Sequence, residues 1–383
     1  MSIQTPVAAV QERVHAPFPW YGGKARAAQL IWERLGNVGN YVEPFAGSLA
    51  VLLGRPHAPG IETVNDKDAF ISNFWRATCA TGDPDAVAYW CDQPADESML
   101  HAVHSWLVNQ REEFTARLMG DPDYYDAKVA GRWCWGLCCW IGSGWCSGQG
   151  PWQSLDGQLL HLGNAGRGIH RQLLHLGDAG QGVHRKRLHL GDAVRGIHRQ
   201  RLHLGDAGRG IHRQLLHLGT AGQAENGLVA WLRTLAVRLR RVRVCCGDWT
   251  RVLGPSVTWK HGLTGVVLDC PYQSEEREDV YSVDTPQIAE DVREWARVNG
   301  ENPLLRIALC GYETATYAMP ETWQKVCWKA NGGYGNQRTQ GCNPNKYRET
   351  VWFSPACLGP TQPTLFERKN QEAPLVAPGT AHG

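Results

Sequence analysis

The sequence lacks any apolar run long enough to cross a membrane. Its longest nearly apolar stretch, WCWGLCCWIGSGWC at 133–146, contains glycine and is shorter than the roughly 18–20 residues that a membrane-spanning helix needs. The N-terminal residues 1–20 also lack a basic segment followed by an apolar core and a small-residue cleavage site, so no secretory signal is recognised. We therefore expect a cytoplasmic protein with no membrane partner.

The signatures of a dinucleotide site and of a zinc site are absent as well. No GxGxxG turn, which would receive a pyrophosphate, occurs in the chain. Four cysteines are clustered, but their spacing is not that of two CxxC pairs: Cys134, Cys138, Cys139 and Cys146. Because no export signal accompanies the 13 cysteines, we expect reduced, buried thiols rather than disulfides, and we predict no metal site.

The charge is distributed unevenly along the 383 residues. Residues 158–243 contain 15 Lys and Arg against 4 Asp and Glu, a net charge of +11; since the whole chain carries +2, the remainder carries 2 − 11 = −9. A basic segment on an acidic body is typical of a protein that binds a polyanion. The alternative is that LRTLAVRLRRVRV at 232–244 is a helix that runs into a strand, with its arginines in solvent. The charge pattern leaves both interpretations open.

A tandem repeat with a period of 14 residues occupies the middle of the chain. Histidines mark the period at 161, 175, 189, 203 and 217, and apolar residues recur every seven positions between them. That spacing suggests a coiled coil, but most units contain three glycines, each of which costs a helix interior about 1 kcal/mol relative to alanine. We predict a flexible insertion, with a small β-turn solenoid as the alternative.

Outside the repeats, short strand-like runs alternate with helix-like ones. Five runs are predicted as strands, at 40–45, 62–68, 242–249, 264–272 and 304–313, and residues 286–300 are predicted as a helix. Buried strands separated by helices are typical of an α/β protein with a parallel, doubly wound sheet. In such sheets, ligands bind beyond the carboxyl ends of the strands.

Acidic residues occur at four of the predicted strand ends. They are Glu43, Asp66, Asp248 and Asp269, and one tight turn, EPFAGSLAVLL, places Gly47 after the first strand. Carboxylates accept hydrogen bonds from ribose hydroxyls and attract an ammonium group, but they repel phosphate. A ligand with a ribose, an adenine and an ammonium group but no phosphate fits this edge, and S-adenosylmethionine is such a ligand.

Four short motifs occur in order along the chain. They are PFPWYGGK at 17–24, YVEPFAGS at 41–48, VND at 64–66 and DCPY at 269–272. In this order they resemble the Dam-like family of adenine-specific DNA methyltransferases, the alpha group by motif order, and also its phage- and prophage-borne branch. The resemblance extends through RIALCGYE, GGYGNQ and ETVWFSP, so that it covers residues 15–157 and 226–358.

The resemblance implies a Rossmann-like methyltransferase sheet that is interrupted by a helical DNA-recognition insertion, here extended by the repeats. The expected divisions are 15–75 and 226–358 for the two parts of the catalytic domain, 76–157 for the recognition insertion, 158–225 for the repeats and 359–383 for a disordered tail. It also implies which residues bind S-adenosylmethionine: Trp20, Lys24, Asp66 and Asp269 directly, Glu43 and Gly47 by shaping the loop, and Asp248 with Trp249 beside the adenine.

The motif DCPY, residues 269–272, is where the resemblance implies catalysis. The Asp269 carboxylate and the backbone carbonyl of Cys270 would accept the two hydrogens of an adenine amino group, with Pro271 shaping the turn, and Tyr272 would stack on the flipped base. The family's usual tetrapeptide is Asp-Pro-Pro-Tyr, so Cys270 is a departure that keeps the carbonyl but loses the fixed φ of proline. Leu49, where many relatives have glycine, is a second departure, which we expect the loop to tolerate.

The predicted function is site-specific methylation of the adenine N6 amino group in double-stranded DNA, in the cytoplasm of a bacterial host. The Trp-rich stretch 133–152 and the loop 332–340 with Arg338 lie where the family places DNA contacts, although hydrophobic packing is the alternative for the tryptophans. Cytosine N4 methylation and a non-catalytic DNA-binding protein are the alternative functions. A monomer or weak dimer is expected, and a partner restriction nuclease is left open.

Overall fold

The structure is a computed structural model. It describes residues 14–20, 23–121, 123–140, 145–146, 152–155, 158–161, 227–271, 287–312, 319–327 and 349–360. Several predicted features lie outside these residues: Tyr272, the 332–340 loop with Arg338, most of the tandem repeat and the segment from 361 onward.

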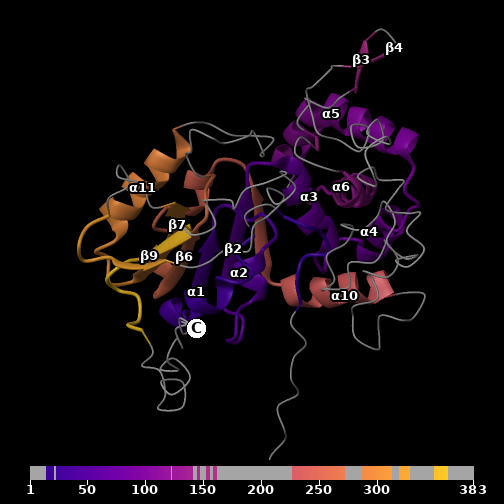
Figure 1. The fold of residues 1–383 in the computed structure, drawn as a ribbon. Helices are drawn as coiled ribbons and strands as arrows, with labels where there is room; N and C mark the ends of the chain where they lie inside the picture. Colours follow the sequence, from indigo (N-terminus) through magenta and orange to yellow (C-terminus); the bar gives the residue numbers. More distant parts are fainter. Residues whose placement is uncertain are drawn as a thin grey trace, which may run out of the picture.

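A seven-stranded sheet forms the centre of the molecule (Figure 1). Its order is β5-β2-β1-β6-β7-β9-β8. The strands are β1 (Asn40–Glu43), β2 (Ile61–Asp66), β5 (Val242–Cys246), β6 (Thr264–Leu268), β7 (Leu305–Tyr312), β8 (Gln324–Cys327) and β9 (Glu349–Phe353). A separate antiparallel hairpin consists of β3 (Trp152–Leu155) and β4 (Gln158–His161).

The five predicted strands are present, and they are parallel to one another. β5 pairs with β2, β2 with β1, β1 with β6, and β6 with β7, each in parallel register. The α/β class predicted from the sequence is therefore confirmed, and the mostly parallel sheet is consistent with a Rossmann-like methyltransferase. The sequence did not predict β8 or β9, and β9 runs antiparallel to both β7 and β8.

Alternate residues of the central strands are buried on opposite faces of the sheet. Tyr41 and Val267 belong to one apolar cluster, whereas their neighbours Val42 and Leu268 belong to another. The first cluster includes side chains from α1 (Ala28–Leu35), α2 (Ala50–Leu53) and α10 (Gly227–Leu239), and the second includes those of α11 (Ile288–Asn299). Because both faces are covered, the strands read as continuous apolar runs in the sequence.

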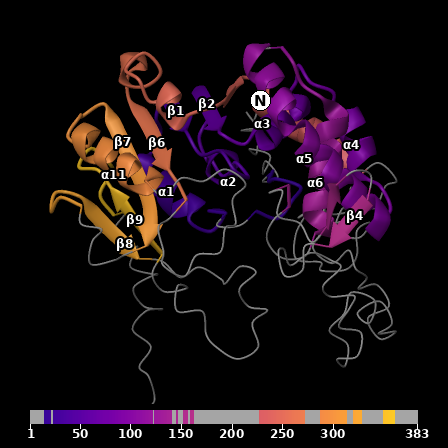
Figure 2. The same ribbon diagram turned by 90° about the horizontal axis from the view of Figure 1, so that it is seen from above.

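Four further helices connect β2 to the hairpin, and an aspartate caps each of them. They are α3 (Ala69–Thr78), α4 (Pro84–Cys91), α5 (Glu97–Gly120) and α6 (Ala127–Cys139). The side chains of Asp68, Asp83, Asp96 and Asp126 accept hydrogen bonds from backbone N–H groups in the first turns, which stabilises each helix start. The second view shows α4, α5 and α6 together on the side of the molecule opposite α11 (Figure 2). Of the described helices, including the 24-residue α5, none has the length and apolar character that would let it cross a membrane.

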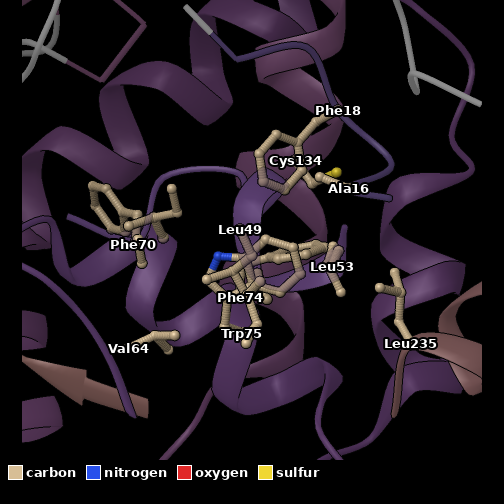
Figure 3. Close-up of a cluster of buried hydrophobic side chains, with 14 of the residues drawn as sticks. Ala16, Phe18, Leu49, Leu53, Val64, Phe70, Phe74, Trp75, Cys134 and Leu235 are labelled. Atoms are coloured by element: carbon tan, nitrogen blue, oxygen red, sulfur yellow. The ribbon is translucent and has the colours of Figure 1, made fainter. Parts of the chain in front are cut away.

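The N-terminal segment packs between the sheet and these helices. Phe18 lies edge-on to Phe74 of α3, with ring centroids 5.1 Å apart, and edge-on to Trp133 of α6, with centroids 5.2 Å apart. Figure 3 shows Phe18 close to Cys134, with Phe74 and Trp75 below them. The helices between β2 and β5 thus fix the segment that leads directly into Trp20.

An internal ion cluster joins α10 to β2. Arg238 donates to both oxygens of Glu62, at 2.7 and 3.0 Å, and Arg55 pairs with the same carboxylate at 3.1 Å. Glu62 is almost fully buried, so its charge is compensated inside the protein. The segment 232–244 is a helix that runs into a strand, as one interpretation expected, but Arg238 is not in solvent: it holds the helix on the sheet.

Candidate functional site

The four predicted acids lie at the carboxyl ends of adjacent strands. Glu43 and Asp66 are the last residues of β1 and β2, Asp248 follows β5, and Asp269 follows β6. Since these strands are parallel neighbours in the order β5-β2-β1-β6, the acids form a row along one edge of the sheet. The row predicted from the sequence is therefore present.

The backbone fixes the Asp66 carboxylate at the middle of this edge. Its Oδ2 atom accepts a hydrogen bond from the Gly47 N–H and its Oδ1 atom one from the Asp68 N–H, both at 3.0 Å. Burial raises the pKa of Asp66 to about 7, although both hydrogen bonds act in the opposite direction. The carboxylate is thus oriented by the backbone while its charge lacks full compensation.

Asn65 ties the turns after three strands together. Its side-chain amide donates to the carbonyl of Pro44, after β1, at 3.1 Å and to the carbonyl of Gly247, after β5, at 3.0 Å. The N–H of Gly247 in turn donates to the backbone oxygen of Asp66 at 3.0 Å. These bonds hold the loops that present Asp66 and Asp248 in one fixed arrangement.

Trp20 covers the turn that contains Gly47. A β-carbon on Gly47 would lie 2.5 Å from the indole Nε1 of Trp20, and Gly47 has a φ of +45°, which favours glycine. The indole of Trp75 donates to the Gly47 carbonyl at 2.9 Å from the other side. The structure thus brings Trp20, Gly47 and Asp66 together.

Asp248 and Trp249 form the edge of the site beyond Asp66. The Asp248 carboxylate accepts from the backbone N–H of Thr250 at 3.0 Å and also from the Thr250 hydroxyl, and these bonds lower the pKa of Asp248. The Trp249 ring stacks on Phe45, with centroids 6.2 Å apart and planes at 29°. An aromatic pair therefore borders the row of acids on this side.

Lys24 lies at the other end of the row, between two carboxylates. Its Nζ atom is 2.9 Å from Asp269 Oδ1 and 3.8 Å from Glu349 Oε2. Burial alone would lower the pKa of Lys24, but the two carboxylates outweigh it and raise that pKa above its ordinary value. Lys24 was expected to contact the cofactor; the structure pairs it with the predicted catalytic acid.

Glu43 is buried between the two ends of the row. The Tyr41 hydroxyl donates to its Oε2 atom at 2.9 Å. Burial raises the pKa of Glu43 to about 8, and the nearby charge of Asp269 adds to the increase. At neutral pH Glu43 therefore exists largely in the protonated form, which places it in the wall of the site rather than among its charges.

The chain after Asp269 turns back into the core. The Cys270 side chain is 3% exposed and packs with the apolar cluster of α11, while Pro271 is partly exposed. A buried side chain at this position leaves the main chain as the part of Cys270 available to a ligand. Tyr272, the last residue of the motif, lies outside the described residues.

Two residues that the sequence analysis did not select contact the site. Glu349 is the first residue of β9, and the signal that could have revealed it is an acid at the start of a largely apolar strand. Arg111 of α5 pairs with Asp68 at 3.6 Å and lies over the Phe70 ring at 4.7 Å, and no sequence pattern marks it. Within the part of the chain that the structure describes, no three His, Cys, Asp or Glu side chains are grouped so that they could hold a metal ion.

A comparison with protein families finds a match in the N-terminal part of the chain. Residues 20–116 match the D12 class of N6 adenine-specific DNA methyltransferases, a segment that runs from Trp20 through β1 and β2 into α5. Among curated proteins, no sequence matches the chain. The matched segment contains Lys24, Glu43, Gly47 and Asp66, the residues that shape one half of the edge described above. Residues 20–116 are therefore similar to the D12 class of N6 adenine-specific DNA methyltransferases, which supports the resemblance to the Dam-like family and an adenine-specific DNA methyltransferase activity.

Proposed function

We propose that the methyl donor is S-adenosylmethionine and that the enzyme methylates the adenine N6 amino group at a specific sequence of double-stranded DNA. One observation carries the proposal: the row of acids along the sheet edge ends at Asp269, whose carboxylate is held by the buried Lys24. The part of the edge around Asp66 suits a cationic, ribose-bearing ligand. The part around Asp269 suits an amino group.

The residues at the Asp66 part fit the cofactor by charge and shape. The pKa of Asp66 is raised to about 7 because backbone amides alone partner the buried carboxylate among the described contacts, so a ligand that donates hydrogen bonds or carries positive charge is favoured there. The aromatic rings of Trp20 and the Phe45–Trp249 pair flank this part. When bound, S-adenosylmethionine supplies an electrophilic methyl group on a positively charged sulfur.

Asp269 and Cys270 then orient the amino group that is methylated. The lone pair of an exocyclic adenine amine is delocalised into the ring, so the amine is a poor nucleophile. The Asp269 carboxylate and the Cys270 carbonyl would each accept one of the two amino hydrogens. Together they favour a pyramidal nitrogen, whose lone pair points at the methyl group. The buried Cys270 side chain agrees with a main-chain role, and catalysis is then mostly positioning and electrostatics.

The helices between β2 and β5 are the proposed DNA-recognition insertion. Lys128 on α6 lies over the rings of Trp90 and Trp106, at 5.3 and 5.2 Å from their centroids. Arg132, one turn further along, lies over Trp90 at 5.1 Å. In the described part of the chain neither cation forms an ion pair with a carboxylate, so both charges remain available to phosphates. The division at 76–157 and the repeats at 158–225 stay predictions.

The test is transfer of labelled methyl from S-adenosylmethionine to double-stranded DNA, followed by nucleoside digestion and mass spectrometry. We expect labelled N6-methyladenine from the wild-type protein and, by sequencing, one short recognition site. Asp269→Ala should abolish the label, whereas Cys270→Ala should keep it because the carbonyl remains. Label on cytosine N4 instead would contradict the proposed base.

A binding measurement tests the cofactor independently of the reaction. Asp66→Asn should weaken binding of S-adenosylmethionine by about 10- to 100-fold in calorimetry, because a charge-assisted hydrogen bond is lost. Asp85→Asn is the matched control, since Asp85 is an exposed acid paired with Arg233 at 2.6 Å. Equal affinities for the two variants would argue against the proposed cofactor site.

A further inference from the structure

Glu349 is a second buried carboxylate beside Lys24. It opens β9 opposite Tyr312 of β7, and its side chain is 10% exposed. Its Oε2 atom lies 3.8 Å from Lys24 Nζ and accepts no hydrogen bond within the described part of the chain. A buried carboxylate oxygen without a hydrogen bond is unfavourable for folding, so its position suggests a role in the site.

The groups around Lys24 carry one more negative charge than positive. The ammonium of Lys24 faces the carboxylates of Asp269 and Glu349 and the thiol of Cys310 on β7. Burial raises the pKa of the Cys310 thiol well above its ordinary value, so the thiol is uncharged. Burial also raises the pKa of Glu43, which faces Asp269 from β1, to about 8. Burial raises the pKa of Glu349 as well, and the charge of Lys24 acts in the opposite direction. When both carboxylates are ionised, the net charge of the group is −1.

Asp269 alone would have two conflicting duties. In the proposed reaction it accepts a hydrogen of the adenine amino group, yet Lys24 donates to the same carboxylate at 2.9 Å. An acceptor whose charge is neutralised by an ammonium is weaker toward a second donor. A further counter-ion of the lysine would relieve this conflict, and Glu349 is placed to be one.

We propose that Glu349 is a positioning residue: as the second counter-ion of Lys24, it leaves the Asp269 carboxylate able to bind the adenine amino group. The proposal rests on the function proposed above for Asp269. As the N6 atom gains the methyl group, the C–S bond breaks with its electron pair left on sulfur, and N6 becomes positively charged. One N–H bond then breaks with its pair left on nitrogen, and the proton passes to Asp269 and on to water. A group with net charge −1 stabilises the positive N6; with Glu349 neutralised, the group has no net charge.

The test is the single-turnover rate of methyl transfer with saturating DNA and S-adenosylmethionine. Glu349→Gln, which keeps the shape and removes the charge, should lower this rate about tenfold or more. The KM for DNA and the calorimetric Kd for S-adenosylmethionine should change by less than about twofold, since Glu349 acts on the step and not on either ligand. Glu294→Gln is the matched control, because Glu294 is an exposed acid of α11 paired with Arg297.

A conservative variant separates charge from shape. Glu349→Asp keeps the charge but shortens the side chain, and we expect it to retain more of the single-turnover rate than Glu349→Gln. A purely structural role predicts the reverse order, because glutamine has the shape of glutamate. Melting curves of both variants show whether either folds poorly. If Glu349→Gln does, the rate of Glu349→Asp still tests the role of the charge.

A double-mutant cycle shows whether Glu349 acts through Lys24. In a Lys24→Met background, Glu349→Gln should lower the rate by less than about twofold, because the ammonium it balances is gone. Independent, multiplicative effects of the two substitutions would overturn the proposal. If the wild type methylates adenine and Glu349→Gln is equally fast, the role of Glu349 is wrong and the proposed function stands; if the wild type transfers no methyl from S-adenosylmethionine, both fall.

Discussion

The indole of Trp20 occupies the space that a side chain on Gly47 would need. Built on Gly47, a β-carbon would lie 2.5 Å from the indole Nε1 and 3.0 Å from its Cδ1, and the φ of +45° would strain any other residue. The N–H of the same glycine donates to Asp66 Oδ2 at 3.0 Å. Gly47 therefore positions an aromatic ring and a carboxylate at once, and both belong to the proposed cofactor site.

Gly47→Ala should consequently disturb stability and cofactor binding together. Strain at the positive φ and displacement of Trp20 should lower the free energy of unfolding by about 2–4 kcal/mol. The affinity for S-adenosylmethionine, measured by calorimetry, should fall as well. Gly254→Ala is the control, because a β-carbon at Gly254 meets nothing within 4 Å. Wild-type affinity in a destabilised Gly47→Ala protein would separate Gly47 from the cofactor site.

At Leu49, substitution by glycine should destabilise the protein no more than substitution by alanine does. The φ of Leu49 is +54°, and its side chain is fully buried before α2. Leu49→Ala should lower the free energy of unfolding by about 2–4 kcal/mol through loss of packing, and Leu49→Gly by no more than that, because glycine is favoured at positive φ by about 1 kcal/mol.

At Leu52, inside α2 and equally buried, the order should reverse. There Leu52→Gly should be about 0.5–1 kcal/mol less stable than Leu52→Ala, since glycine weakens a helix interior. Chemical denaturation of the four variants measures both differences. If glycine is the worse substitution at both positions, the left-handed backbone at Leu49 is contradicted.

Glu43 should make the protein less stable as the pH rises. Its pKa is raised from 4.5 to about 8 in the folded protein, so between these values the folded chain holds a proton that the unfolded chain has released. The free energy of unfolding therefore falls as the pH rises from about 4.5 to 8, and the loss persists above 8. Glu43→Gln should remove this contribution and gain stability relative to the wild type across that range.

Thermal unfolding at several pH values measures the difference between the two proteins. Asp66, with a pKa raised to about 7, contributes to the slope of both, so it cancels in the comparison. Glu33→Gln is the control, because Glu33 is an exposed acid of α1 that accepts from Gln29 at 3.0 Å. If the stability of the wild type and that of Glu43→Gln change in the same way with pH, burial does not raise the pKa of Glu43.

Local sequence patterns predicted the parallel strands of the sheet. They did not predict the pairings that depend on contacts between distant parts of the chain. The five central strands are recognisable because each is a short apolar run, and the acids at their ends form a row because parallel strands share one carboxyl edge. The strand β8 has only four residues of alternating burial, so it carries a weak signal, and β9 pairs antiparallel with β7 across a long connection.

The candidate site shows the same division. Asp66 and Gly47 could be selected from their turns, and the structure joins them by a hydrogen bond. Lys24 could also be selected from its motif, but its ion pairs with Asp269 and Glu349, which lie far along the chain, could not be predicted. No local pattern relates residues at such separations, because a buried ion cluster depends on which strands become neighbours.

Arg238 provides the last prediction, since one of the two interpretations placed it in solvent and it is found against Glu62. It donates to both oxygens of that carboxylate and to the Leu52 carbonyl at the end of α2. Arg238→Met should lower the free energy of unfolding by about 3 kcal/mol, because among the described residues the buried Glu62 then keeps only Arg55 as an ion-pair partner. Arg233→Met on the same helix removes an exposed ion pair with Asp85 and should change the free energy of unfolding much less, because solvent screens an exposed pair. Chemical denaturation of both variants measures this contrast, and similar losses would mean that the Arg238–Glu62 pair is no stronger than a surface contact. A large loss for Arg238→Met alone would show that α10 is held on β2 by this pair, and hence that the chain returns from the repeat segment to the sheet at a fixed point.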